Sequence, residues 1–195
     1  MDLRDNAIVC STRPHGETAV IARLLSEQHG LLACYVAGGR GRQLRPVLIP
    51  GNLVQAELRS RSESQLPFGR LELSHSRAPW LAEPLPAAAI GWVTTLTTAA
   101  LAERQPYPGL FAALSGLLDA VCHAPSARGW LPGLVAYEAL LLRELGYGGA
   151  APDPAAGLAE FDAVGQRIER YLLADRHGDV MGARAILRER LARIG

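Results

Sequence analysis

A glycine- and arginine-rich segment, residues 38–42 (GGRGR) followed by Arg45, has the clearest chemical signal in the sequence. Glycines let a backbone approach a ligand closely, and the guanidinium groups of Arg40, Arg42 and Arg45 can each donate paired hydrogen bonds to phosphate. The segment therefore predicts a clamp on a nucleic-acid backbone. The alternative is a solvated loop whose arginines only maintain solubility. A P-loop is excluded because no Lys-Ser/Thr pair follows the glycines.

Three more arginines follow on what reads as a β scaffold. Between Arg40 and Arg77 the chain has seven arginines and three acids. Two of these arginines share one face of a predicted strand, and a third lies on the next strand. We assign nucleic-acid binding to six arginines, called the basic stripe: Arg40, Arg42, Arg45, Arg59, Arg61 and Arg70. Alternatively, the strand arginines form exposed pairs of little energy with the acids of this region, Glu57, Glu63 and Glu72.

The positive charge is local. The formal net charge of the 195 residues is +1, and all twenty basic side chains are arginine. Residues 78–175 have five arginines and ten acids, whereas residues 176–195 have five arginines and two acids. A local excess concentrates the field where a polyanion docks. Since Tyr35 and Phe68 are the only Phe, Tyr or Trp residues before residue 79, we expect backbone contacts rather than base stacking to dominate.

No arrangement for catalysis or metal binding is indicated. The five histidines lack a second ligand at helical spacing, and Cys10, Cys34 and Cys122 lie far apart without a Cys/His pairing. A Ser-His-Glu triad drawn within residues 11–17 lacks both a nucleophile elbow and an oxyanion loop. The residues therefore indicate no catalytic triad, and we expect no cofactor and no metal.

The sequence favours a cytoplasmic location. Residues 1–7 include charged side chains and no apolar segment, so we expect no signal peptide. Residues 84–102 have no formal charge, but four threonines and two prolines make them only weakly apolar. They predict a buried helix rather than a membrane span.

The fold class expected is α+β, with an N-terminal five-stranded OB-fold barrel followed by an all-α C-terminal domain. The period-2 alternation and the turn residues predict five strands, at residues 7–12, 18–25, 31–37, 52–61 and 70–74. Periodicity alone would also permit a helix at 18–25. Five short strands in about seventy-five residues favour a small Greek-key barrel, here assigned to residues 1–78.

The second domain, residues 79–195, changes to alanine, leucine and threonine at helical spacing. The predicted helices cover residues 86–101, 108–122, 131–145, 158–173 and 182–194. In the last of these, one apolar face is expected to pack on the domain: Ala183, Leu187, Leu191 and Ile194. Its flanking arginines are expected to point outward: Arg184, Arg188, Arg190 and Arg193. There they would pair with Glu160, Asp162 or Glu169, or else extend the basic stripe.

Several motifs, taken in order, resemble those of the bacterial RecO family. They are residues 11–18 (STRPHGET), 30–32 (GLL), 38–42, Tyr137-Glu138 and 145–148 (LGYG). The resemblance implies an N-terminal OB-fold, a helical C-terminal domain and no enzymatic activity. It also implies a recombination mediator that binds and anneals DNA and, with RecR, loads recombinase onto strands coated by SSB.

Two departures from this family pattern affect what the resemblance implies. Many relatives insert a zinc-ribbon-like segment after the LGY helix, whereas residues 149–157 are a short Ala/Pro connection without cysteine. Zinc is therefore not implied. Some relatives hold the acidic tail of SSB with basic residues just before the aromatic-Glu pair, where this chain has Val135 and Ala136.

We therefore expect a non-enzymatic DNA repair and recombination mediator with little sequence preference, because phosphate contacts are many and base-reading groups few. The alternative is a protein-interaction adaptor whose barrel binds acidic partner segments. A third reading, an RNA-binding translation factor, is disfavoured by the few stacking aromatics.

Overall fold

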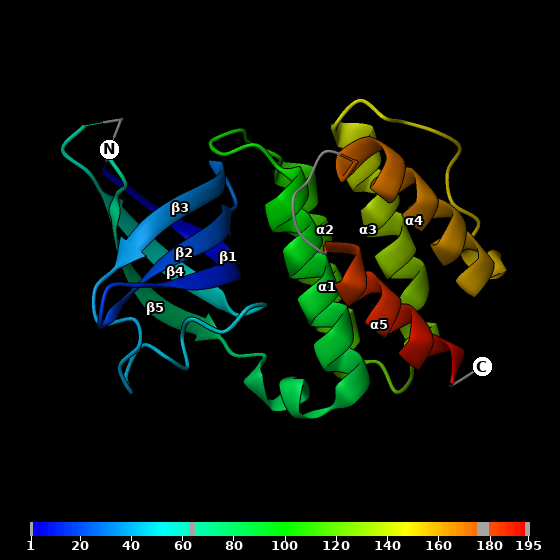
Figure 1. Cartoon of the computed structure of the whole chain (residues 1–195), viewed down its shortest axis with the longest axis horizontal. Coiled ribbons are helices and arrows are strands. Elements are labelled where there is room, and N and C mark those ends of the chain that lie inside the picture. The colour runs from blue at the N-terminus through cyan, green and yellow to red at the C-terminus, as the bar shows by residue number, and fades with distance from the viewer. Residues whose placement is uncertain (1, 63–64, 175–179, 194–195) are drawn as a thin grey trace.

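The structure, a computed structural model, describes residues 2–62, 65–174 and 180–193. Its N-terminal part is a closed barrel with strand order β1-β2-β3-β5-β4 (Figure 1). The strands are β1 (Asp2–His15), β2 (Ala19–Ser26), β3 (Gly30–Val36), β4 (Leu53–Arg59) and β5 (Phe68–His75). Neighbouring strands are antiparallel except β3 and β5, which close the barrel in parallel. The expected five-stranded barrel is confirmed.

β1 is longer than the predicted 7–12, since it begins at Asp2 and ends at His15. Residues 2–6 are largely polar, so hydrophobic alternation does not reveal them as strand. They nevertheless pair in register with residues 55–59 of β4. The extension therefore depends on a partner strand, not on local pattern.

The C-terminal part is helical, as expected. Its α-helices are α1 (Pro84–Ala100), α2 (Pro108–His123), α3 (Leu131–Glu144), α4 (Leu158–Leu172) and α5 (Val180–Ala192). Short 3-10 turns cover Ala78–Ala82, Ala127–Gly129 and Pro154–Ala156. Proline occupies the first turn of α1, α2 and α3, where its missing N–H costs no hydrogen bond. None of the described helices could serve as a transmembrane span.

α1 lies against the barrel, and the two parts share an apolar core (Figure 1). Four consecutive residues of β1, residues 7–10, are buried because both faces of this strand are covered. Val9 faces the barrel interior, whereas Ile8 and Cys10 join the cluster that contains Trp92 and Val93 of α1. The predicted domain boundary between residues 78 and 79 stays a prediction.

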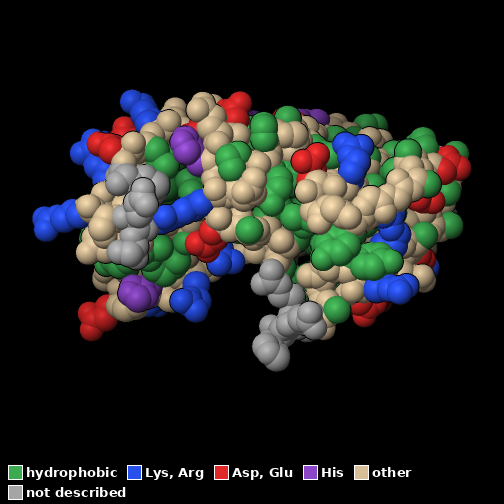
Figure 2. Space-filling model, turned by 90° about the horizontal axis from the view of Figure 1, so that it is seen from above, with side chains coloured by type: hydrophobic (Ala, Val, Ile, Leu, Met, Phe, Trp, Pro, Cys, Tyr) green, Lys and Arg blue, Asp and Glu red, His purple; other side chains and the backbone are tan. Residues whose placement is uncertain are grey.

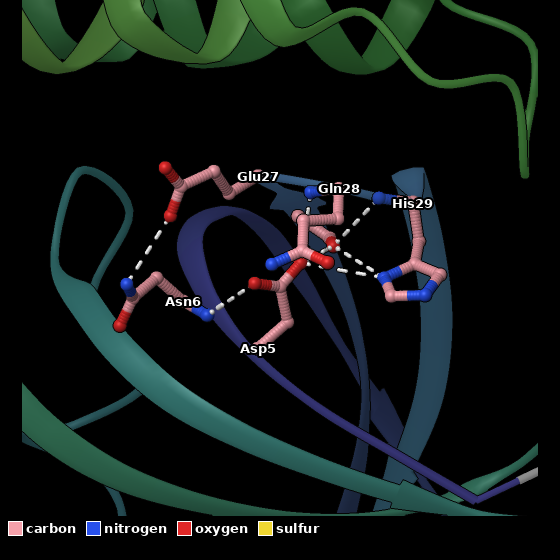
Figure 3. Close-up of polar contacts among 6 residues, drawn as sticks. Asp5, Asn6, Glu27, Gln28 and His29 are labelled. Carbon is pink, nitrogen blue, oxygen red and sulfur yellow. Dashed lines mark hydrogen bonds and ion pairs between the residues drawn. The ribbon is translucent and has the colours of Figure 1, made fainter.

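A buried carboxylate fixes the turn between β2 and β3 to β1 (Figure 3). Asp5 Oδ2 accepts hydrogen bonds from the Ser26 hydroxyl and from the Gln28 backbone N–H at 2.9 Å. His29 Nδ1 lies 3.3 Å from the same oxygen, and Asp5 Oδ1 accepts from the Asn6 N–H at 2.8 Å. Because serine binds aspartate directly, the imidazole does not relay between them. The cluster is a structural clamp on the hairpin.

A second buried carboxylate, Glu138 of α3, connects three helices. It accepts from Trp92 Nε1 at 2.6 Å and from Arg184 Nε and Nη2 at 3.1 and 2.8 Å. Burial raises the pKa of Glu138, while the hydrogen bonds and charge of Arg184 and the bond from Trp92 oppose the rise. The Arg184 guanidinium also lies 3.6 Å from the ring centroid of Phe161. Gly165 leaves room for it, since a Cβ there would lie 2.0 Å from Arg184 Nη1.

The expectation that Arg184 points outward is therefore wrong. The side chain is buried because its charge is matched by Glu138, which the sequence indicated only as part of a helix core. The predicted docking of the apolar face is confirmed for Leu187 and Leu191, which are buried, and Ile194 lies outside the described residues.

The other arginines of α5 are engaged at the surface. Arg188 pairs with Asp162 at 2.8 Å, one of the three acids expected to receive them. Arg190 donates to the Pro84 carbonyl, and Arg193 pairs with a glutamate one turn earlier on α5. Within the described residues these contacts favour the structural role of α5 over an extension of the basic stripe.

Candidate nucleic-acid interface

The loop between β3 and β4 is held against the turn between β1 and β2. The Arg40 backbone N–H donates to the Thr18 carbonyl, and its Nη1 donates to the Glu17 carbonyl, both at 2.9 Å. Gly39 is buried, and a Cβ there would lie 2.6 Å from Val20 Cγ2. The loop is thus a fixed part of the barrel and not a freely solvated segment.

The remaining arginines of this loop are available to a ligand. Arg42 and Arg45 are exposed, and neither has an acidic partner among the described residues. The base of the loop is fixed by Asn52, whose Nδ2 donates to the Pro46 carbonyl at 2.8 Å, and by the buried Leu48. The two guanidinium groups therefore project from a supported backbone.

Arg59 and Arg70 form exposed ion pairs, and Glu72, one of the three acids that the sequence suggested as partners, takes part in one of them. Arg59 Nε lies 3.6 Å from an Asp2 carboxylate oxygen across the β1–β4 pair. Arg70 Nη2 lies 3.5 Å from a Glu72 oxygen on its own strand. Exposed pairs of this length contribute little, and a phosphate competes readily with such carboxylates. These ion pairs therefore reduce the availability of Arg59 and Arg70 to phosphate but do not abolish it.

Arg61 lies beyond the end of β4, so it does not share a strand face with Arg59 as predicted. It lines an open hollow of about 790 Å³ together with Arg59 and Phe68. Glu57, a predicted partner of the stripe, lies 3.7 Å from Arg4 instead. Glu63, another predicted partner, lies outside the described residues.

Arg77, the seventh arginine of the basic region, is not on the surface. It is 1% exposed, and it donates to the Gly51 carbonyl and to an Asp119 oxygen of α2, both at 2.6 Å. Its N–H donates to the Asn52 side chain at 2.8 Å. Arg77 therefore joins the barrel to the helices.

In the view of Figure 2, arginines project from the barrel end of the molecule, with acidic side chains among them.

The fold brings together aromatic residues that the sequence separates. The rings of Tyr35 and Phe68 have centroids 5.2 Å apart, and His15 lies 5.8 Å from Tyr35. Only two Phe, Tyr or Trp residues precede residue 79, which predicts little stacking. The cluster is not visible in the sequence because alternation shows which side chains face outward, whereas strand register decides which of them meet.

The cysteines are buried thiols. Burial raises the pKa of both Cys10 and Cys34 to about 12, and it also raises the pKa of Cys122. Such thiols are poor metal ligands and nucleophiles because the thiolate is the reactive form. The described residues contain no group of three or more His, Cys, Asp or Glu side chains that could hold a metal. The expected absence of zinc stays a prediction.

Val135 and Ala136, the positions matched to basic tail-binding residues, line an apolar cavity of about 270 Å³. Its other lining residues include Pro132 and two acids, Asp153 and Glu160, but no arginine. Its acids would repel an acidic segment. This cavity is therefore a poor site for an acidic protein tail.

Comparison with known proteins identifies both halves of the chain. Residues 1–75 match the family profile described as Recombination protein O N terminal, and residues 84–151 match Recombination protein O C terminal. A DNA repair protein RecO of Rhodospirillum centenum is 44% identical over 149 residues, covering 76% of this chain and 58% of the relative. One from Rhizobium etli is 35% identical over 182 residues, covering 91% and 66%. The chain thus spans about three fifths to two thirds of the length of these relatives.

Proposed function

The chain belongs to the RecO family of DNA repair and recombination proteins, and on that basis we propose that it is a DNA-binding recombination mediator. It binds single- and double-stranded DNA largely through the phosphate backbone and promotes annealing. With RecR it supports recombinase loading on SSB-coated DNA. It acts by binding, without catalysis.

The observation that supports this proposal is that most arginines of the basic stripe are exposed and have weak ion pairs or none among the described residues. Arg42, Arg45 and Arg61 are exposed without an acidic partner among the described residues. Arg59 and Arg70 have only long, exposed pairs. Such guanidinium groups bind phosphate favourably, because phosphate accepts paired hydrogen bonds and the binding releases counterions from the DNA.

Annealing follows from the same surface. Two DNA strands repel each other through their phosphates, and a basic surface that holds both reduces this repulsion. The contacts are to the backbone, so they do not depend on sequence. The mediator therefore favours pairing of any complementary strands.

We expect DNA affinity to fall steeply with salt. If about four to six phosphates are neutralised, the slope of log K against log salt concentration is roughly −3 to −5. Fluorescence anisotropy with labelled single-stranded and duplex DNA at several salt concentrations measures it. A flat response would contradict backbone binding and favour an adaptor that binds acidic protein segments.

Replacing Arg40, Arg42 and Arg45 together by alanine should weaken binding to all DNA sequences alike. The salt slope should become shallower by about two to three, because each lost phosphate contact removes nearly one unit. The melting temperature should change little, since these side chains are exposed.

A matched control removes three exposed arginines from the helical part, Arg128, Arg143 and Arg170. It changes net charge equally but should retain most of the affinity. Equal losses in both variants would indicate a general charge effect and place no site on the loop.

A further inference from the structure

A transverse row of outward-facing residues crosses the barrel in register. Phe68 of β5 lies opposite Arg59 of β4 on one side and opposite Tyr35 of β3 on the other. Tyr35 lies opposite Ile21 of β2, which lies opposite Arg13 of β1. Directly paired residues share a face, and the alternate residues of these strands fill the barrel interior. The row therefore has an aromatic centre and an arginine at each end.

The aromatic centre is open to solvent. Phe68 is 64% exposed, although phenylalanine is ordinarily buried. Tyr35 meets it edge to face at an interplanar angle of 72°, and His15 meets Tyr35 at 87°. Tyr35 and His15 thus support the Phe68 ring from the side, leaving ring surface free.

A glycine next to Phe68 permits this arrangement. Gly69 points toward the barrel interior, where a Cβ would lie 2.8 Å from Cys34 Sγ and 3.2 Å from Leu58 Cδ2. Without a side chain at this position, β5 approaches β3 closely enough for Phe68 to contact Tyr35. The missing side chain at Gly69 therefore permits both the closure of the barrel and the contact between Phe68 and Tyr35.

We propose that Phe68, supported by Tyr35 and His15, is a stacking platform for an unpaired base of single-stranded DNA. Arg59 and Arg13 hold the phosphates on either side of that base. Both guanidinium groups are exposed, and Arg13 has no acidic partner among the described residues. This inference rests on the proposed function and narrows it to a preference for single strands, because bases in a duplex are already stacked on one another.

The charges favour nucleic acid over an apolar protein segment as the occupant. Arg59 and Arg70 border the exposed ring, and the register places Arg13 three strands from Phe68, or roughly 14 Å at about 4.8 Å per strand. Aromatic rings between cationic groups match the alternation of bases and phosphates along one strand.

The test compares three probes at one salt concentration: a thymine oligonucleotide, an abasic oligonucleotide of equal length, and a duplex. Phe68→Ala should weaken binding of the thymine strand by about five-fold to 100-fold, the range expected for one stacked base. Affinity for the abasic strand and for the duplex should change by less than about two-fold, and the slope of log K against log salt concentration should stay the same. Phe68→Trp should retain the preference.

Leu73→Ala is the matched control, since Leu73 is another exposed apolar residue of β5 but has no aromatic neighbour in the cluster. It should leave all three affinities unchanged. If Phe68→Leu retained full affinity, or Phe68→Ala weakened thymine and abasic strands equally, the stacking platform would be wrong. A steep salt slope in the unmodified protein with no effect of Phe68→Ala overturns only this inference. A flat slope overturns the proposed function itself.

Discussion

Replacing Arg184 by alanine is expected to lower the free energy of unfolding by about 3–5 kcal/mol, the cost of breaking a buried ion pair by removing one partner. The variant leaves the Glu138 carboxylate fully buried with Trp92 Nε1 as its remaining donor of the three. It also leaves an empty space beside Gly165, which the Arg184 guanidinium fills in the unmodified protein. Urea denaturation followed by circular dichroism measures the change.

Two variants control this experiment. Arg188, on the same helix as Arg184, forms a surface pair with Asp162, so Arg188→Ala should leave stability nearly unchanged. Combining Arg184→Met with Glu138→Leu should recover much of the loss, because an apolar pair avoids the desolvation of two charges. A fully stable Arg184→Ala protein would show that the buried pair has no stabilising role.

The stability of the Arg184→Ala variant should also depend on pH differently from that of the unmodified protein. Burial raises the pKa of Glu138, and without Arg184 nothing but Trp92 opposes the rise. The folded variant then keeps a proton that the unfolded chain releases near pH ~4.3. The contribution of Glu138 to stability is therefore largest below that value and is lost as pH rises, so the loss of stability relative to the unmodified protein should grow toward neutrality. Unfolding midpoints at about pH 5 and about pH 8 report the sign.

Ending the chain after Asp179 is expected to destabilise the protein even more. It removes α5, and with it Leu187 and Leu191, whose burial contributes roughly 1.5–3 kcal/mol each. It also removes Arg184, so the loss described above is included. Thermal unfolding should show the helical part melting well below the full chain.

DNA binding separates this structural role from a direct one. At a temperature where the shortened chain remains folded, its affinity for DNA should stay within a few-fold of the full chain, because α5 packs on α1 and α4. Normal melting combined with loss of most DNA affinity would make α5 a DNA contact and contradict the structural assignment.

Local sequence signals are enough to predict the order and approximate limits of the elements. Prolines at the starts of α1, α2 and α3, together with apolar periodicity, are local signals, and a helix needs no distant partner for its backbone hydrogen bonds. The five strands were likewise found from alternation and turns. The loop arginines of the basic stripe could be singled out because glycine and arginine adjoin along the chain.

Contacts between residues that are distant in the sequence depend on how the elements pack. The polar residues 2–6 become strand because β4 supplies their hydrogen bonds. Arg184 turns inward because the packed helices place the Glu138 carboxylate, 46 residues earlier, within hydrogen-bonding distance of its guanidinium group. His15, Tyr35 and Phe68 form one cluster because barrel closure sets the register of β3 against β5. A sequence pattern reports which neighbours a residue has along the chain, whereas burial of charge and clustering of rings depend on contacts made only when distant elements pack.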